Sequence, residues 1–169
     1  MSYFEEAVNE VLKTEGGFVN HPADKGGATN LGITQSTLEW YRGTKVTVDA
    51  VKNLKIEEVK NIYKKLYWDK MKLDLCEKHY IAMIAFDQAV NRGVMNSAMM
   101  VQDAVGVSAD GLVGKITMAA INASDERTVV IKMIKSSQLA YARIVKNNPS
   151  QAVFIEGWIA RTHRFFSFI

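Results

Sequence analysis

The sequence predicts a mainly α-helical fold that contains at most one short β-hairpin. Apolar residues recur at helical spacing in one segment after another along the 169 residues. The alternation of apolar and polar residues that is typical of half-buried strands is almost absent. Helix-capping residues precede many of these segments, and Gly or Pro follows them. The length suits one compact domain or two small lobes that share a core.

The first predicted helix begins at Ser2, which forms a capping box with Glu5 three residues later. Apolar side chains then follow at helical spacing, and Gly16-Gly17 is expected to end the helix. Residues 16–33 are rich in Gly, Asn and Asp. They are too polar and too interrupted to pack as long strands, so we predict a loop with at most a short hairpin.

Two short helices are predicted after this loop. Thr34 is the expected cap of the first, which ends at Gly43, and Thr47 is the expected cap of the second. Residues 56–67 place their apolar side chains on one face, which predicts a longer amphipathic helix. Residues 79–92 are so apolar that we expect the buried central helix there.

The second half of the chain is predicted to consist of helices joined by tight turns. Asp110-Gly111 is a turn signal, and Asn147-Asn148-Pro149 interrupts the helical pattern near the C-terminus. Asp125 is the expected start of the longest helix. The predicted helices of this half are residues 96–105, a segment after Gly114, residues 125–146 and residues 151–164.

The composition excludes several classes of site. The single cysteine, Cys76, cannot form an internal disulfide, and His21, His79 and His163 lie far apart in the sequence. No pair has the spacing of metal ligands, so we expect neither a metal nor another cofactor. The net charge of +3 favours polyanionic partners only weakly. Because no basic stripe is interleaved with aromatic residues, we expect no nucleic-acid partner.

Glu15 is the first candidate for a catalytic residue. We expect it in the last turn of the first helix, where unpaired carbonyl groups and the helix dipole disfavour a carboxylate. The protonated acid, favoured by the same field, is the form that a glycosidase needs in its general acid. Asp24 lies in the polar loop and is expected to stay ionised, which would complete a carboxyl pair. An ordinary helix end is the alternative interpretation of Glu15.

The motifs around Glu15 resemble those of a known family. Their order is similar to the Glu–Asp–Thr arrangement of phage-type lysozymes, and more closely to glycoside hydrolase family 108. That family comprises small N-acetylmuramidases, including phage endolysins and secretion activator proteins. The matching residues are Glu15-Gly16-Gly17-Phe18, Asp24, Gly26-Gly27, Thr29-Asn30, Gly32-Ile33-Thr34, Tyr63, Tyr67-Trp68 and residues 86–93. The matching residues of the attached peptidoglycan-binding half are Val101-Gln102, Val105-Gly106-Val107, Asp110-Gly111, Gly114 and Thr117.

The resemblance implies a lysozyme-like catalytic half over residues 1–93. It implies a helical peptidoglycan-binding half over residues 94–169, packed with the first as one compact unit. Glu15 would be the general acid, with Asp24 and Thr29 as further catalytic residues. The interval from Asp24 to Thr29 is one residue shorter than in the phage-type lysozymes, so three roles stay open for Asp24. It positions water, stabilises the oxocarbenium-like centre, or caps a turn of the loop.

Four residues are predicted to bind the glycan. Aromatic faces stack on sugar rings and amides bind N-acetyl groups, which makes Trp68 and Asn91 candidates. Thr34 and Asp87 lie within the matching motifs and complete the set. For Trp68, packing in the core is an equally good interpretation.

The function predicted from these features is hydrolysis of the β-1,4 bond between N-acetylmuramic acid and N-acetylglucosamine in peptidoglycan. A lytic transglycosylase and a non-catalytic protein for wall binding or export are the alternatives. The N-terminus has no signal-peptide pattern, and no apolar run is long enough for stable membrane insertion. We therefore expect synthesis in the cytoplasm and action in the periplasm or wall after release by a holin or an export system.

Overall fold

The computed structural model describes residues 2–20 and 27–169, and these residues are mainly helical, which confirms the predicted fold class. The chain divides into two compact units. The smaller unit comprises Val8–Leu66, and the larger comprises the chain up to Ala7 together with Tyr67–Ile169. The predicted division between residues 93 and 94 stays a prediction.

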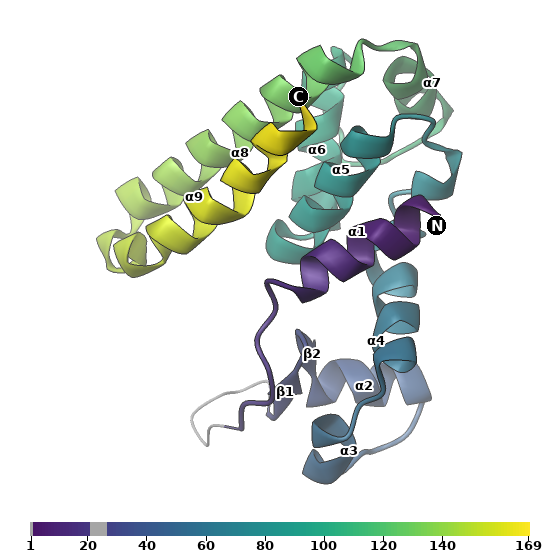
Figure 1. The fold of residues 1–169 in the computed structure, drawn as a ribbon, viewed down its shortest axis with the longest axis vertical. Coiled ribbons are helices and arrows are strands. Elements are labelled where there is room, and N and C mark those ends of the chain that lie inside the picture. The colour runs from purple at the N-terminus through teal and green to yellow at the C-terminus, as the bar shows by residue number, and fades with distance from the viewer. Residues whose placement is uncertain (1, 21–26) are drawn as a thin grey trace. The chain divides into compact units, whose positions relative to one another are not determined.

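The smaller unit holds one hairpin and a set of short helices (Figure 1). The first helix, α1, begins in the larger unit, and the π-helical turn η1 also crosses the division. The elements are α1 (Tyr3–Leu12), β1 (Thr29–Asn30), β2 (Ile33–Thr34), α2 (Gln35–Arg42), α3 (Val48–Lys52), α4 (Ile56–Tyr63) and η1 (Lys64–Trp68).

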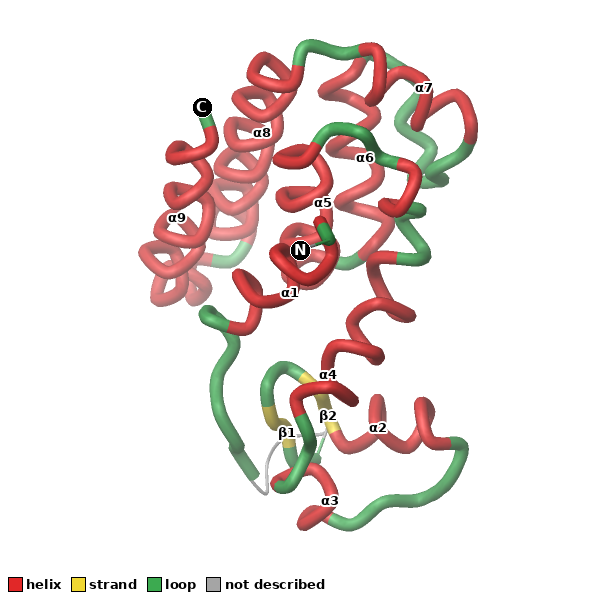
Figure 2. Tube along the Cα trace, turned by 45° about the vertical axis from the view of Figure 1, so that its right-hand side comes forward, coloured by secondary structure: helices red, strands yellow, loops and turns green. Residues whose placement is uncertain are grey.

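The short hairpin within the polar loop is confirmed. Its antiparallel strands, drawn in yellow in Figure 2, pair Thr29 with Thr34 and Asn30 with Ile33. The two residues between them, Leu31 and Gly32, have φ angles of 50° and 74°. Positive φ at both positions matches the twist of a two-residue hairpin, and such a turn favours glycine.

The predicted caps of the short helices are confirmed. The Thr37 amide donates to Thr34 Oγ1 over 3.1 Å at the start of α2, and Gly43 ends that helix with a φ of 69°. The Ala50 amide donates in the same way to Thr47 Oγ1 over 3.2 Å. These helices therefore begin and end where local hydrogen bonding dictates.

Two predicted helix ends were wrong. Helix α1 ends at Leu12 rather than near Gly16, because the Thr14 amide and hydroxyl both donate to the Val11 carbonyl, over 2.9 and 2.8 Å. A threonine hydroxyl that competes in this way closes the last turn. The helix predicted over residues 151–164 is also shorter, since Pro149–Phe154 and Arg164–Phe168 are 3₁₀ segments on either side of α9 (Ile155–His163).

The larger unit is built around α5. All of residues 81–89 in this helix are buried, which confirms the predicted central helix. Helices α6 and α8 contact α5, and α9 lies against α8 as its antiparallel neighbour in Figures 1 and 2. The remaining elements are η2 (Leu73–Leu75), α5 (His79–Arg92), α6 (Val94–Val105), α7 (Lys115–Ala123), α8 (Glu126–Asn147), η3 (Pro149–Phe154) and η4 (Arg164–Phe168).

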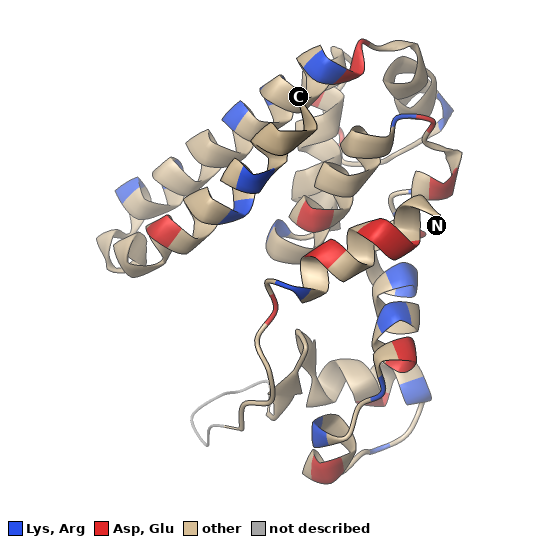
Figure 3. Ribbon diagram, in the orientation of Figure 1, with Lys and Arg blue, Asp and Glu red and all other residues tan. Residues whose placement is uncertain are grey.

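Basic and acidic residues are distributed unevenly over the helices (Figure 3). Helix α8 carries five lysine and arginine residues and one glutamate, whereas α1 carries glutamates and no basic residue. Among the described residues, no helix combines the length and the apolar character that crossing a bilayer requires.

Gln102 holds the turn that follows α6. Its buried Nε2 donates to Asp110 Oδ1 over 2.7 Å and to Leu112 O and Thr117 Oγ1 over 3.2 Å each. Its Oε1 accepts from the Gly111 amide over 2.9 Å. One side chain thus satisfies several polar groups that the turn would otherwise leave without partners.

Replacing Gln102 by Leu is therefore expected to lower the free energy of unfolding by about 1–3 kcal/mol, because buried polar groups lose their partner. Urea unfolding followed by circular dichroism measures this change. Gln138→Leu is the matched control. Gln138 is a half-buried residue of α8, and its replacement is expected to change the free energy of unfolding by less than about 0.5 kcal/mol. Equal stability of the two variants would show that Gln102 does not support the turn.

Candidate functional site

The carboxyl group of Glu15 lies against the turn of the hairpin. Glu15 is half-buried and lies beyond the end of α1, in a bend. A Cβ atom added to Gly32 would be 2.9 Å from Glu15 Oε2 and 3.4 Å from Glu15 Cδ. The prediction that Glu15 lies in the last turn of the first helix was wrong, because α1 ends at Leu12. Instead, the carboxyl group is held where the backbone of the turn comes close to it.

Tyr63, in the last turn of α4, reaches the same point. Its side chain is 1% exposed, and its hydroxyl donates to the Leu31 carbonyl over 3.1 Å. A Cβ atom on Gly32 would lie only 2.3 Å from Tyr63 Oη. The Glu15 carboxyl and the Tyr63 hydroxyl thus occupy the space that a side chain at position 32 would need. This requirement, together with the positive φ, is why the position takes glycine.

Backbone hydrogen bonds tie the hairpin to the segment that carries Glu15. The Leu31 amide donates to the Gly16 carbonyl over 3.1 Å. Val19 and Thr29 exchange two backbone hydrogen bonds of 2.8 Å each. These bonds hold the residues that directly follow Glu15, so its carboxyl group keeps its position against the turn.

A side-chain amide fixes the hairpin from its other side. Asn30 Nδ2 donates to the carbonyls of Val51 and Lys52 at the end of α3, over 3.1 and 3.0 Å. Asn30 is 9% exposed, so these bonds are largely shielded from water. The hairpin is therefore a rigid support for the Glu15 carboxyl, which a catalytic acid requires.

Three predicted residues lie in or near this hairpin. Thr29 and Thr34 are directly paired, so their side chains emerge on the same face of the ladder. The Thr34 hydroxyl is occupied as the cap of α2, whereas Thr29 is half-exposed. Asp24 lies outside the described residues. The structure therefore places Glu15, Thr29 and Thr34 in the same unit.

Trp68 belongs to the core of the larger unit. It is 1% exposed, its Nε1 donates to Asp74 Oδ1 over 2.7 Å, and its ring packs edge-on against Phe4 and Phe86. Of the two interpretations of Trp68, packing in the core is therefore the one that this structure shows. Stacking on a sugar would require the ring to leave this cluster.

Asp87 forms buried ion pairs with two arginines. Its carboxylate is 1% exposed and accepts hydrogen bonds from Arg161 Nε over 2.9 and 3.1 Å, and it also forms a salt bridge with Arg164. The two arginines come from α9 and the segment after it, so Asp87 anchors the C-terminal helix on α5. Glycan binding by Asp87 stays a prediction.

Asn91 lies near the C-terminal end of α5 and is half-buried. Its Oδ1 accepts a hydrogen bond of 2.7 Å from the hydroxyl of Tyr141 on α8. Burial raises the pKa of Tyr141, which keeps that hydroxyl protonated as the donor. Asn91 also lines a cavity of this unit, so a soluble molecule can reach its side chain.

The sequence and the fold both match known families. The family described as Glycosyl hydrolase 108 matches residues 8–93, which include Glu15, the hairpin and Tyr63. The chain belongs to the glycosyl hydrolase 108 family. A second family, described as Predicted Peptidoglycan domain, matches residues 96–163.

A solved structure supports the assignment to glycosyl hydrolase 108. The structure of Brucella abortus SagA is 32% identical in sequence and has a TM-score of 0.79. The match covers 97% of this chain and 91% of that chain. No similar sequence was found among curated proteins. The two family assignments support a role in peptidoglycan hydrolysis or wall binding, with peptidoglycan as a partner.

Sequence reasoning missed two residues of this glycosyl hydrolase 108 site. Tyr63 was named only among the residues that match the family, yet its buried hydroxyl reaches the turn beside Glu15. Asn30 was noted only as part of a motif, yet it fixes the hairpin to α3.

Within the described residues, no group of three or more His, Cys, Asp or Glu side chains is arranged to hold a metal ion.

Proposed function

We propose that this protein is an N-acetylmuramidase that hydrolyses the β-1,4 bond between N-acetylmuramic acid and N-acetylglucosamine, with Glu15 as the general acid. The observation that carries the proposal is the placement of the Glu15 carboxyl against Gly32 in the rigid hairpin turn. This turn lies in the region that matches the glycosyl hydrolase 108 family.

The reaction needs a proton for the leaving oxygen. In the proposed mechanism, the Glu15 carboxylic acid gives its proton to the glycosidic oxygen as the bond from that oxygen to C1 of N-acetylmuramic acid breaks. Positive charge develops on C1 and the ring oxygen, and a water molecule then adds to C1. The proton released by that water finally restores the acid.

Tyr63 acts in this scheme as a positioning residue. Its hydroxyl holds the Leu31 carbonyl, so the hairpin turn keeps its distance from the Glu15 carboxyl. Thr29 offers a hydroxyl on the same hairpin and is the proposed holder of the attacking water. Asp24 is proposed to stabilise the charge on C1 or to orient that water.

Wall binding without cleavage is a second candidate function. The match of residues 96–163 to the Predicted Peptidoglycan domain favours it, because this region does not include Glu15. A lytic transglycosylase would cleave the same bond with the same acid but without water.

Mass spectrometry of the muropeptides released from purified wall distinguishes the three functions. Hydrolysis is expected to yield products that end in a reducing N-acetylmuramic acid, which borohydride converts to the alcohol. Products that end in the anhydro sugar, lighter by one water, would identify a transglycosylase. Co-sedimentation with the wall in the absence of released products would support binding alone and would contradict the muramidase proposal.

A further inference from the structure

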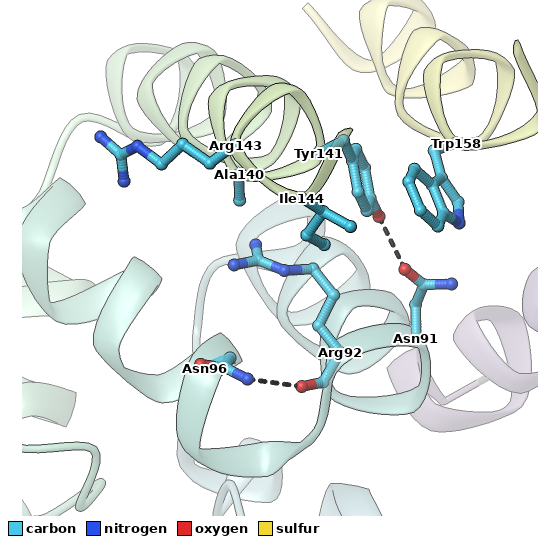
Figure 4. Close-up of a pocket in the computed structure, with 8 residues that line it drawn as sticks. All are labelled: Asn91, Arg92, Asn96, Ala140, Tyr141, Arg143, Ile144 and Trp158. Carbon is cyan, nitrogen blue, oxygen red and sulfur yellow. Dashed lines mark hydrogen bonds between the residues drawn. The ribbon is translucent and has the colours of Figure 1, made fainter. Parts of the chain in front are cut away.

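The larger unit contains a cavity beside Asn91 (Figure 4). Its volume is about 420 Å³, which lies in the range of small-molecule sites and suits a sugar with a short peptide. Helices α5, α6, α8 and α9 contribute to its wall. The lining residues that matter here are Asn91, Arg92, Asn96, Tyr141, Arg143 and Trp158.

Two arginines of the cavity have no acidic partner within the part of the chain that the structure describes. Arg92 makes one long hydrogen bond to Gln88 Oε1, of 3.4 Å, and its guanidinium lies 5.9 Å from the centre of the Tyr141 ring. Arg143, two residues after Tyr141 on α8, also lines the cavity and is exposed. By contrast, Arg42 is paired with a glutamate at 2.7 Å. The positive charge of the cavity is thus left for a ligand.

The environment of Arg92 strengthens its attraction for an anion. Arg92 is half-buried, and burial lowers the pKa of its guanidinium below the ordinary value for arginine, which still leaves the group charged at neutral pH. A partly desolvated cation attracts a carboxylate more strongly than an exposed one. The predominance of basic residues on α8 adds a field of the same sign (Figure 3).

Aromatic rings form another part of the cavity wall. The ring of Trp158 stacks on that of Tyr141, with centroids 5.1 Å apart, and lies away from both guanidinium groups in Figure 4. Asn91 Oδ1 accepts a hydrogen bond from the Tyr141 hydroxyl, and Asn96 Nδ2 donates one to the Arg92 carbonyl, over 2.7 Å in each case. Each amide therefore keeps its other polar atom for a ligand, as an N-acetyl sugar requires.

We propose that this cavity binds the peptide-substituted N-acetylmuramic acid of peptidoglycan, with the carboxylates of the stem peptide on Arg92 and Arg143. The choice of ligand rests on the proposed function, because a wall strand is the anion that the enzyme would meet. The carboxylates lie against the guanidinium groups, and the sugar lies towards Asn91 and Trp158. The cavity is thus a specificity site that distinguishes peptide-bearing glycan from bare glycan.

The test uses the full chain carrying Glu15→Gln, so that ligands are bound but not cleaved. Isothermal titration calorimetry compares N-acetylmuramyl-L-alanyl-D-glutamate, its diamide and the uncharged disaccharide of N-acetylglucosamine. We expect the acid to bind most tightly. Arg92→Gln is expected to weaken its binding about tenfold to a hundredfold, as loss of a charged hydrogen bond predicts. Arg92→Lys is expected to restore part of the affinity, and Arg143→Gln to have a smaller effect because that side chain is exposed.

Arg127→Gln is the matched control, because it removes the same charge from the exposed N-terminal turn of α8 and is expected to leave the affinity unchanged. Equal affinity for the acid and its diamide, or equal losses in Arg92→Gln and Arg127→Gln, would overturn the proposal. If Arg92→Gln does not fold, the Arg143→Gln variant, whose mutated side chain is exposed, and the comparison of the three ligands still test the cavity proposal.

A wild-type chain that binds the acid but releases no muropeptide would contradict the muramidase function and leave the cavity proposal intact. Cleavage of wall by the wild type, together with an affinity for the acid that Arg92→Gln leaves unchanged, would support the muramidase function and overturn the cavity proposal.

Discussion

Replacing Glu15 by Gln is expected to reduce wall cleavage by about 10²–10⁴-fold, the range for loss of a general acid. Glutamine has the size and shape of the glutamic acid but cannot protonate the glycosidic oxygen. The side chain is half-buried beside Gly32, and the isosteric amide fits the same space. The loss of turbidity of purified wall and the yield of muropeptides measure the activity, and circular dichroism verifies the fold.

Glu57→Gln is the matched control for this variant. Glu57 lies in the first turn of α4 in the same unit and is exposed, so its loss removes the same charge without touching the hairpin. We expect its activity to equal that of the wild type. Substantial cleavage by a folded Glu15→Gln protein would mean that another group supplies the proton.

Replacing Gly32 by Ala is the second variant with a large expected effect. The new Cβ would meet Tyr63 Oη at 2.3 Å and Glu15 Oε2 at 2.9 Å, so the carboxyl group has to move. Because a displacement of about 1 Å at a reacting group can cost about 10²-fold in rate, we expect activity to fall by that order. We also expect the free energy of unfolding to fall by about 1–3 kcal/mol from the steric overlap.

Gly43→Ala separates this overlap from backbone strain. Gly43 has nearly the same φ, 69° against 74°, but a Cβ there would meet nothing within 4 Å. Its only expected cost is the left-handed conformation, about 1 kcal/mol, with activity unchanged. Activity assays and urea unfolding of both variants provide the comparison. Equal losses of activity in the two would refute a role for close packing at the turn.

A double variant locates the overlap further. Adding Tyr63→Phe to Gly32→Ala removes the nearer of the two contacts but leaves the Glu15 contact at 2.9 Å. Stability is therefore expected to recover in part, whereas activity is expected to stay low. Full recovery of activity would show that Tyr63, and not displacement of Glu15, limits the Gly32→Ala protein.

Short-range signals predicted most of the elements correctly. Thr34, Gly43 and Thr47 bound their helices as expected, because a cap forms hydrogen bonds with residues only a few positions away. Gly32 lies in the short hairpin that was expected for the polar loop. The end of α1 was missed because the Thr14 hydroxyl competes for the Val11 carbonyl, a choice that helical periodicity does not register.

The sequence by itself determined the helical fold, the hairpin and the position of Glu15 beside it in the chain, since periodicity, caps and motif order are local properties. Only the tertiary structure decided which distant side chains meet. It brought Tyr63 to the hairpin turn, buried Trp68 among aromatic rings and joined Asp87 to Arg161. Such contacts depend on how helices pack, and the same residue types at the same spacings are compatible with an exposed site or with a core.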